Sequence, residues 1–415
     1  MHRVPNYNNP FLAFVRYRNF RLYWIGMCIS LVGTWMQNIA QPWLALTITN
    51  NAFLVSLVSA FQFIPTLLFS LLSGVLIDKA NKKQILKITQ TGFLLVSVAF
   101  AVMIYSNHVR YSYILFLAFC LGLFNAVDVP CRQSFIFELI DQKEDLPNAI
   151  ALNSMAFNAA RILGPSVAGI VMATLGTGAC FIINAISFLA ILTSLFFIQT
   201  NPQPVEAKPD ENMLANLQEG LHYVQDRKIL STTLIIVLIV ATFIPNFNVL
   251  ISAFAKYILK GDEATFGYLM SFLGIGSFLG AFYFALNSKK GPNRRVLFFM
   301  PFVTGLLMII SGIAVSFIMA GILLAVTGFT FVMITSTANS TLQLNTDNQY
   351  RGRVMSIYSL FFGGSTPFGS LYAGFFAQKL SPRWGFYSCG LAVLLFMGCT
   401  MGYHFFGQRN EPELQ

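Results

Sequence analysis

Charged residues are scarce in this chain of 415 residues, where Asp, Glu, Lys and Arg together make up 10% of the sequence. An ordinary soluble domain carries about 25%. Hydrophobic residues reach 56%, and Phe alone occurs 42 times. A water-soluble fold cannot bury that much apolar surface, whereas a lipid bilayer solvates it. The composition therefore excludes an ordinary soluble domain and predicts a protein embedded in a membrane.

Motifs of nucleotide chemistry and hydrolysis are also absent. The chain has no GxxxxGK[ST] phosphate loop, so we do not expect ATP as an energy source. It has no HExxH or GxSxG motif, and its polar loops are too short to hold a catalytic domain. The six cysteines lie in or beside apolar runs without a CxxC pair, as small apolar residues do. We predict no enzyme activity, no cofactor and no metal site.

The net charge of +10 comes from basic residues in short loops between apolar runs. No polar region interleaves basic and aromatic residues, so nucleic acid is not an expected partner. When successive loops are assigned to alternate sides, most of the 26 Lys and Arg residues fall on one side. The positive-inside rule then predicts cytoplasmic N- and C-termini and a multi-pass location in the bacterial inner membrane.

Apolar runs of about 20 residues, the length that crosses a bilayer, recur along the whole chain. We predict twelve spans, near 22–47, 53–77, 85–106, 111–131, 149–175, 178–198, 229–255, 265–287, 296–318, 319–342, 354–377 and 385–407. The split within 296–342 is placed at Ser316 to Gly321, and Pro245 is expected to bend span 7.

The longest polar stretch, 199–228, contains an amphipathic piece from Met213 to Val224. It divides the chain into an N-terminal six-helix bundle, 1–198, and a C-terminal six-helix bundle, 229–415. The predicted fold is an all-α membrane protein of two pseudo-symmetric bundles joined by a cytoplasmic linker, a layout typical of transporters.

The loop between spans 2 and 3 carries a family signature, in which glycine, aspartate and basic residues recur at fixed spacing. Its residues are Gly74, Leu76, Asp78, Lys79, Lys82 and Lys83. This pattern resembles the cytoplasmic gate motif of the major facilitator superfamily. Asn81 stands where Gly is usual, a mild change because Asn tolerates a left-handed turn. The resemblance implies that Asp78 helps to latch the two bundles; alternatively, the loop only sets topology.

Span 5 has small residues at every fourth position, which allow another helix to approach closely. Its packing motif consists of Ala160, Gly164, Pro165, Ala168 and Gly169. The motif looks like the antiporter motif of the same superfamily, with one extra spacing residue, and favours export over uptake. A longer match from Asp128 to Gly169, with Arg351 to Ser356, resembles the exporter branch that includes enterobactin exporters and macrolide efflux proteins.

Asp128 and Arg161 are the only acid and the only base inside the predicted spans. A charge within a membrane is costly and is usually paired or functional. The two could meet at similar depth, either as a static pair or as a switch in which protonation of Asp128 frees Arg161. Ala118 stands where the usual proton-antiport motif has Arg. Proton coupling by the usual route is therefore not implied.

The resemblance implies that spans 1, 4, 7 and 10 line a central cavity. Uncharged polar residues among aromatics suit a bulky amphipathic ligand, although some amides could instead bond helix to helix. The predicted cavity residues are Thr34, Gln37, Asn38, Gln41, Asn125, Thr242, Asn246, Asn339 and Gln343.

We therefore expect a secondary active transporter that uses protons to export a siderophore or another amphipathic small molecule by alternating access. An uptake permease and a lysophospholipid flippase on the same fold are the alternatives. We expect a monomer in the lipid bilayer; the sequence does not show an outer-membrane partner.

Overall fold

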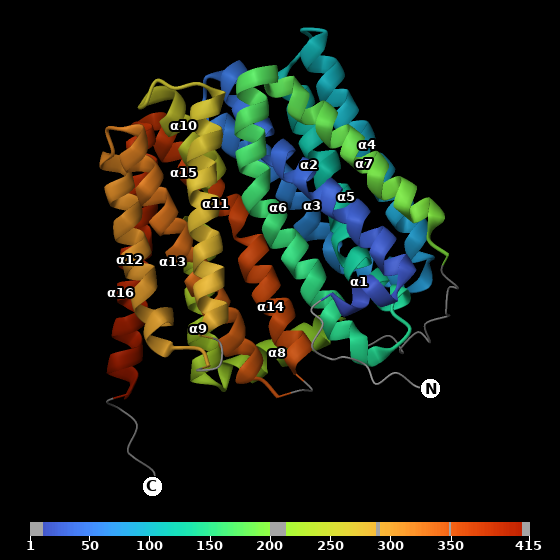
Figure 1. The fold of residues 1–415 in the computed structure, drawn as a ribbon. Coiled ribbons are helices and arrows are strands. Elements are labelled where there is room, and N and C mark those ends of the chain that lie inside the picture. Colours follow the sequence, from blue (N-terminus) through green and yellow to red (C-terminus); the bar gives the residue numbers. More distant parts are fainter. Residues whose placement is uncertain (1–10, 200–212, 288–290, 348–349, 409–415) are drawn as a thin grey trace. The chain divides into compact units, whose positions relative to one another are not determined.

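The computed structural model describes residues 11–199, 213–287, 291–347 and 350–408 (Figure 1). The description excludes the side chains of 67, 70–76, 78–79, 143, 162, 166, 213–217 and 403–408. The described residues form helices and connecting turns without a strand, which confirms the predicted all-α class.

The first part of the chain holds seven α-helices and one 3₁₀ turn. They are α1 (Leu12–Arg16), α2 (Arg18–Thr49), α3 (Ala52–Lys79), α4 (Lys82–Tyr105), α5 (Tyr111–Leu139), η1 (Lys143–Asp145), α6 (Leu146–Leu175) and α7 (Thr177–Phe197). Pro165 lies inside α6, which runs unbroken past it.

The second part begins with the predicted amphipathic helix. Its helices are α8 (Met213–Gln225), α9 (Lys228–Phe243), α10 (Phe247–Tyr257), α11 (Glu263–Leu286), α12 (Arg294–Ile313), α13 (Phe317–Leu344), α14 (Arg351–Gly364), α15 (Thr366–Lys379) and α16 (Pro382–Gln408). Pro245 lies in the break between α9 and α10, as predicted, because proline removes a backbone donor. Pro367 lies in the first turn of α15, where a missing donor costs nothing.

Nine helical segments among the described residues are long and apolar enough to cross a membrane. The predicted split within 296–342 is confirmed, although the turn lies at Ala314 to Ser316, slightly before the predicted position. The Ser316 hydroxyl accepts a hydrogen bond from the Met319 amide and so starts α13. Twelve crossings and cytoplasmic termini stay predictions.

Contacts divide the chain into two compact units. The N-unit consists of Met1–Gln41 and Pro65–Ala207, and the C-unit of Pro42–Ile64 and Lys208–Gln415. The border near residue 207 falls within the predicted linker. The segment Pro42–Ile64, however, belongs by its contacts to the C-unit and not to the bundle 1–198 in which the sequence analysis placed it.

Polar contacts hold this segment in the C-unit. The Lys256 ammonium donates to the Leu46 carbonyl oxygen at 3.2 Å and to Asn50 Oδ1 at 2.8 Å. The Leu46 carbonyl oxygen also accepts from the Asn50 amide at 2.9 Å, so Lys256 adds a second bond at the end of α2. The Ala52 amide, at the start of α3, donates to Gln378 Oε1 at 2.8 Å. The ends of both helices are thus completed by side chains from far along the chain.

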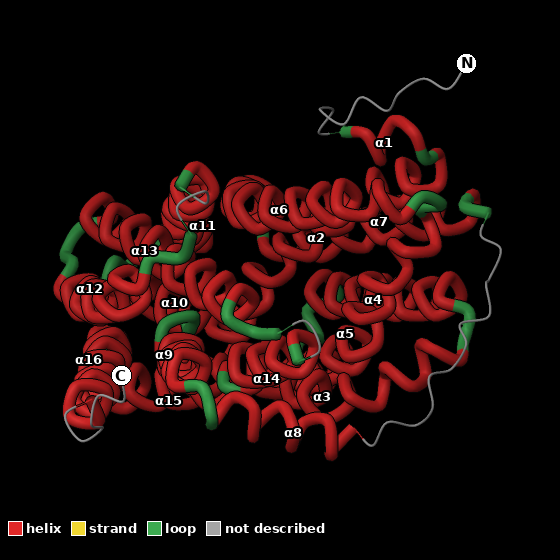
Figure 2. Tube along the Cα trace, turned by 90° about the horizontal axis from the view of Figure 1, so that it is seen from below, coloured by secondary structure: helices red, strands yellow, loops and turns green. Residues whose placement is uncertain are grey.

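Small residues let helices of the C-unit approach each other closely. Within this unit α11 packs along α13 and α12 packs along α16 (Figures 1 and 2). A Cβ atom added at Gly276 would lie 1.7 Å from the Ala325 carbonyl oxygen, and one at Gly328 would lie 2.3 Å from that of Leu273. Close backbone approach is how helices gain packing energy in lipid, where no hydrophobic force drives them together.

We therefore expect Gly276→Ala to destabilise the C-unit. The added methyl group meets backbone that cannot rotate away, at a cost of about 1–3 kcal/mol or more, which exceeds the roughly 1 kcal/mol that Ala gains over Gly in a helix. Thermal unfolding of the purified protein in detergent would show a lower midpoint. The control is Gly398→Ala, whose Cβ meets nothing within 4 Å; an equal midpoint shift in both variants would contradict the packing argument.

Candidate substrate and coupling site

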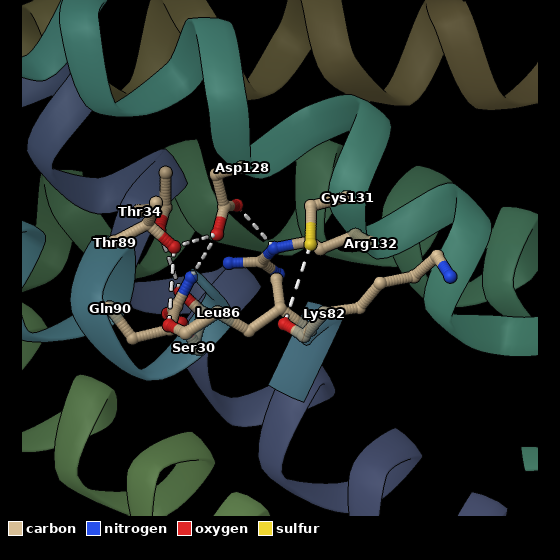
Figure 3. A network of polar contacts seen from close by, with 9 residues as sticks. All are labelled: Ser30, Thr34, Lys82, Leu86, Thr89, Gln90, Asp128, Cys131 and Arg132. Carbon is tan, nitrogen blue, oxygen red and sulfur yellow. Dashed lines mark hydrogen bonds and ion pairs between the residues drawn. The ribbon is translucent and has the colours of Figure 1, made fainter. Parts of the chain in front are cut away.

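A buried carboxylate lies between α4 and α5 in the N-unit (Figure 3). Asp128 of α5 is 3% exposed, and its Oδ1 accepts hydrogen bonds from Thr89 Oγ1 at 2.7 Å and Gln90 Nε2 at 2.6 Å, both on α4. A buried carboxylate is tolerated only when such donors and an opposite charge replace its water. Asp128 therefore ties the two helices together.

The opposite charge is Arg132, one turn further along α5. Its Nε donates to Asp128 Oδ2 at 2.5 Å. Arg132 thus takes the place of Arg161, which the sequence had suggested as the partner of Asp128. It placed Arg132 in a loop after residue 131, whereas α5 continues to Leu139 and brings Arg132 onto the face of Asp128. Asp128 and Arg132 are four residues apart, the spacing that places two side chains on one face of a helix. This spacing would have indicated the pair if the predicted helix had extended past residue 131.

A second ion pair joins the same two helices. Lys82, the first residue of α4, is 7% exposed, and its Nζ lies 2.7 Å from Glu138 Oε1 of α5. The Cys131 thiol contacts the Lys82 carbonyl oxygen at 3.5 Å. Sequence reasoning placed Lys82 in the gate motif but did not find Glu138 as its partner.

The structure describes the side-chain contacts of only part of the gate motif. Lys83 Nζ donates to the Ile198 carbonyl oxygen at 2.5 Å. Asn81 has φ of −68°, so it makes no left-handed turn; its side chain instead accepts from the Gln84 amide and starts α4. Gly74, Leu76, Asp78 and Lys79 lie on α3, and their surroundings fall outside the described residues. The latch role of Asp78 stays a prediction.

The predicted cavity residues of the N-unit form two groups: side chains that are hydrogen-bonded to other described residues, and side chains that are not. Gln37 is 2% exposed, and its Oε1 accepts from Ser97 Oγ and from Asn184 Nδ2, both at 2.7 Å. This network of α2, α4 and α7 holds Gln37 in the helix packing. Thr34 donates to the Ser30 carbonyl oxygen of its own helix.

The free group contains Asn38, Gln41 and Asn125. Both amide atoms of Gln41 are buried and have no hydrogen-bond partner among the described residues. Asn38 and Asn125 are half-buried, and their side chains make no hydrogen bond within the described part of the chain. Polar groups that the protein leaves unpaired inside helices are available to a ligand or to water.

Asn246 of the C-unit has a structural task. It is 2% exposed and lies in the break between α9 and α10, where its Nδ2 donates to the Thr242 carbonyl oxygen at 2.9 Å. Its Oδ1 accepts from Ser370 Oγ of α15 at 3.2 Å. Asn246 therefore repairs backbone acceptors that the break around Pro245 leaves open.

The other predicted cavity residues of the C-unit are more accessible. Thr242 donates to the Leu238 carbonyl oxygen of its own helix. Gln343 Nε2 donates to Asn339 Oδ1 at 2.5 Å, one turn apart on α13. Asn339 is half-buried and Gln343 is exposed in the described structure.

The packing motif of α6 contacts α2 at Gly164, and α7 at Ala168, whose carbonyl oxygen lies 3.9 Å from Cys180 Sγ. Ala160 and Ala168 are buried, and a Cβ added at Gly164 would lie 2.3 Å from Trp35 Cβ. The indole of Trp35 also packs edge-on against Phe157, with ring centroids 5.8 Å apart. Arg161 lies between Phe157 and Gly164 on the same face of α6, since residues three and four apart are neighbours on a helix.

Apolar helices of membrane-crossing length, with buried ion pairs and unpaired amides inside a unit, define a polytopic membrane transporter and not an enzyme. The chain belongs to the transmembrane secretion effector family of the major facilitator superfamily, whose model matches residues 10–410.

Relatives of known name are similar over nearly their whole length. The staphyloferrin A transporter of Staphylococcus aureus is 25% identical over 93% of this chain and 96% of its own. The multidrug efflux pump Tap of Mycolicibacterium fortuitum is 26% identical over 86% and 88%. Macrolide efflux protein A of Streptococcus pyogenes is 20% identical over 93% and 97%.

Solved structures share the fold. A bacterial homologue of the lysosomal transporter Spinster, in an inward-facing conformation, superposes with a TM-score of 0.71 at 13% identity, over 94% of this chain and 97% of that one. A bacterial homologue of the iron transporter ferroportin gives 0.68 at 14% identity, over 93% and 98%. At these identities the likeness concerns the fold alone.

We expect Asp128→Asn to destabilise the N-unit, because it leaves the Arg132 charge without its partner. The free energy of unfolding should fall by about 3 kcal/mol, at the low end for buried pairs, because the Arg132 side chain is 18% exposed. Thermal unfolding in detergent measures it, with the exposed Asp226→Asn as a control that should match the original protein.

The double variant Asp128→Asn/Arg132→Gln completes a thermodynamic cycle. If the pair stabilises the protein, the double variant loses less stability than the sum of the two single losses. Additive losses would show that the two side chains act independently.

Proposed function

We propose that this chain exports a siderophore or another amphipathic small organic molecule across the bacterial inner membrane by alternating access, driven by a proton gradient. The relatives support transport of this kind: one is named for a siderophore, one for multiple drugs and one for macrolides. Their match extends over most of both chains.

The observation that carries the proton step is the buried pair of Asp128 and Arg132. A proton that binds the carboxylate removes the negative charge that balances the Arg132 guanidinium. Oδ1 then also accepts less strongly from Thr89 and Gln90, the two donors on α4. Because these bonds tie α4 to α5, protonation changes the relative stability of the conformations in which the helices are joined or released.

The free amides Asn38, Gln41 and Asn125 are proposed as substrate contacts. Gln37 and Asn246, whose amides are bonded between helices, are proposed as structural residues. The ligand would thus meet the polar groups that helix packing leaves unused, among aromatic side chains that suit its apolar part.

Deletion of the gene tests the direction and the substrate class. Cells that carry the gene and cells that lack it are starved of iron, and mass spectrometry compares siderophores in the cytoplasm and the medium. Erythromycin susceptibility is measured in parallel. We expect a siderophore to accumulate inside the deletion strain and to fall outside, or erythromycin to become more toxic. If the deletion strain instead lost the ability to take up a siderophore, or changed in neither assay, the export proposal would be wrong.

Reconstituted vesicles test the coupling with the compound that the deletion identifies. Asp128→Asn should abolish accumulation driven by an imposed pH difference, while exchange of labelled for unlabelled compound without a gradient persists. Rates are divided by the amount of folded protein, since this variant is less stable. Asp226→Asn is the matched control. Accumulation by Asp128→Asn that responds normally to pH would contradict a coupling role for Asp128.

A further inference from the structure

Arg161 is a positive charge in the middle of the 30-residue helix α6. A helix of that length is about 45 Å long, and the hydrocarbon core of a bilayer is about 30 Å thick. When α6 is centred on the bilayer, Arg161 lies near the middle of the hydrocarbon core, about 15 Å from either headgroup region. A charge at this depth needs a counter-charge or a function.

The described residues provide no counter-charge. Arg161 forms no ion pair or hydrogen bond within them, and its Nε is shut off from solvent without a partner. The neighbouring buried bases behave differently, because Arg132 is paired with Asp128 and Lys82 with Glu138. Both acids are thus already engaged on α5. Toward the described residues, the guanidinium of Arg161 has donors that no acceptor occupies and that a bound anion could use.

The surroundings of Arg161 are aromatic on one side and polar on another. Trp35 touches both Phe157, one turn before Arg161, and Gly164, one turn after it. The indole therefore lies along the face of α6 that carries the guanidinium. Asn38, one turn after Trp35 on α2, has an amide without a partner in the described structure. Trp35 and Phe157 thus provide an apolar surface beside the face of α6 that carries Arg161, and Asn38 lies one turn further along α2.

We propose that Arg161 binds a carboxylate group of the substrate, while Trp35 and Phe157 contact its apolar part. The guanidinium presents its donors in a planar fork that matches the two oxygens of a carboxylate, and it stays charged at any physiological pH. This assignment rests on the proposed function, transport of an amphipathic small molecule, and narrows that class to molecules that carry an anionic group.

The test compares two probes that differ only in charge, pyrenebutyrate and its neutral amide, pyrenebutyramide. The purified full-length protein is placed in phosphatidylcholine nanodiscs, and binding is followed by pyrene fluorescence with empty nanodiscs subtracted. We expect the carboxylate to bind at least about tenfold more tightly than the amide, because a charge-assisted bidentate contact contributes affinity of this order.

Variants assign that preference to Arg161. Arg161→Gln should bind the amide as the original protein does, which also shows that it is folded, and should bind the carboxylate no better than the amide. Arg161→Lys should keep a smaller preference. Trp35→Leu should weaken both probes by a similar factor, because the indole contacts the apolar part. Arg110→Gln, at the start of α5, is the control for loss of a positive charge elsewhere and should keep the full preference.

Three results would overturn the assignment: equal affinity for the two probes or no binding of either, a preference that survives in Arg161→Gln, and a preference that disappears when phosphatidylglycerol replaces part of the lipid. This last comparison is made at high ionic strength, where the anionic surface no longer repels the carboxylate probe; loss of the preference there would mean that Arg161 holds an anionic lipid headgroup. The gene deletion remains a separate test. If it shows no export while the Arg161-dependent preference holds, the proposed export fails and the anion site stands.

Discussion

The absence of water from the bilayer core is the constraint on which the structure of this protein depends. Every backbone amide and carbonyl must find a partner inside the chain, and long helices meet this requirement in their interiors. Where helices stop within a predicted span, side chains take over. Asn246 accepts from Ser370 and donates to the backbone beside the break at Pro245. By contrast, α6 carries Pro165 without a break.

The same constraint governs charge. The N-unit keeps Asp128 and Lys82 buried because each has an opposite charge within 2.7 Å. In the proposed coupling step, a proton on Asp128 leaves the Arg132 charge without its partner, and this cost changes the balance between conformations. Arg161 has no opposite charge beside it among the described residues, and for this reason we propose it as a binding residue and not as a structural one.

Packing in lipid relies on shape more than on hydrophobic force. In the C-unit the glycines of α11 and α13 let backbone meet backbone, and in the N-unit Gly164 lets α6 meet Trp35 of α2. Close packing fixes which face of each helix is covered. It thereby leaves Asn38 accessible while its neighbour Gln37 is enclosed by Ser97 and Asn184.

The sequence by itself determined the membrane class, the break at Pro245 and the amphipathic helix that starts at Met213, because hydrophobic runs and proline act locally. Helical periodicity also grouped the polar residues of α2 on one side, but it could not tell Gln37 from Asn38. Only the tertiary structure decided that Gln37 bonds to two other helices, that Asp128 pairs with Arg132, and that the segment from Pro42 to Ile64 joins the C-unit. The physical reason is that the partner of a buried polar group is set by which helices pack together and how far each extends, and those distances depend on contacts between residues far apart in the chain.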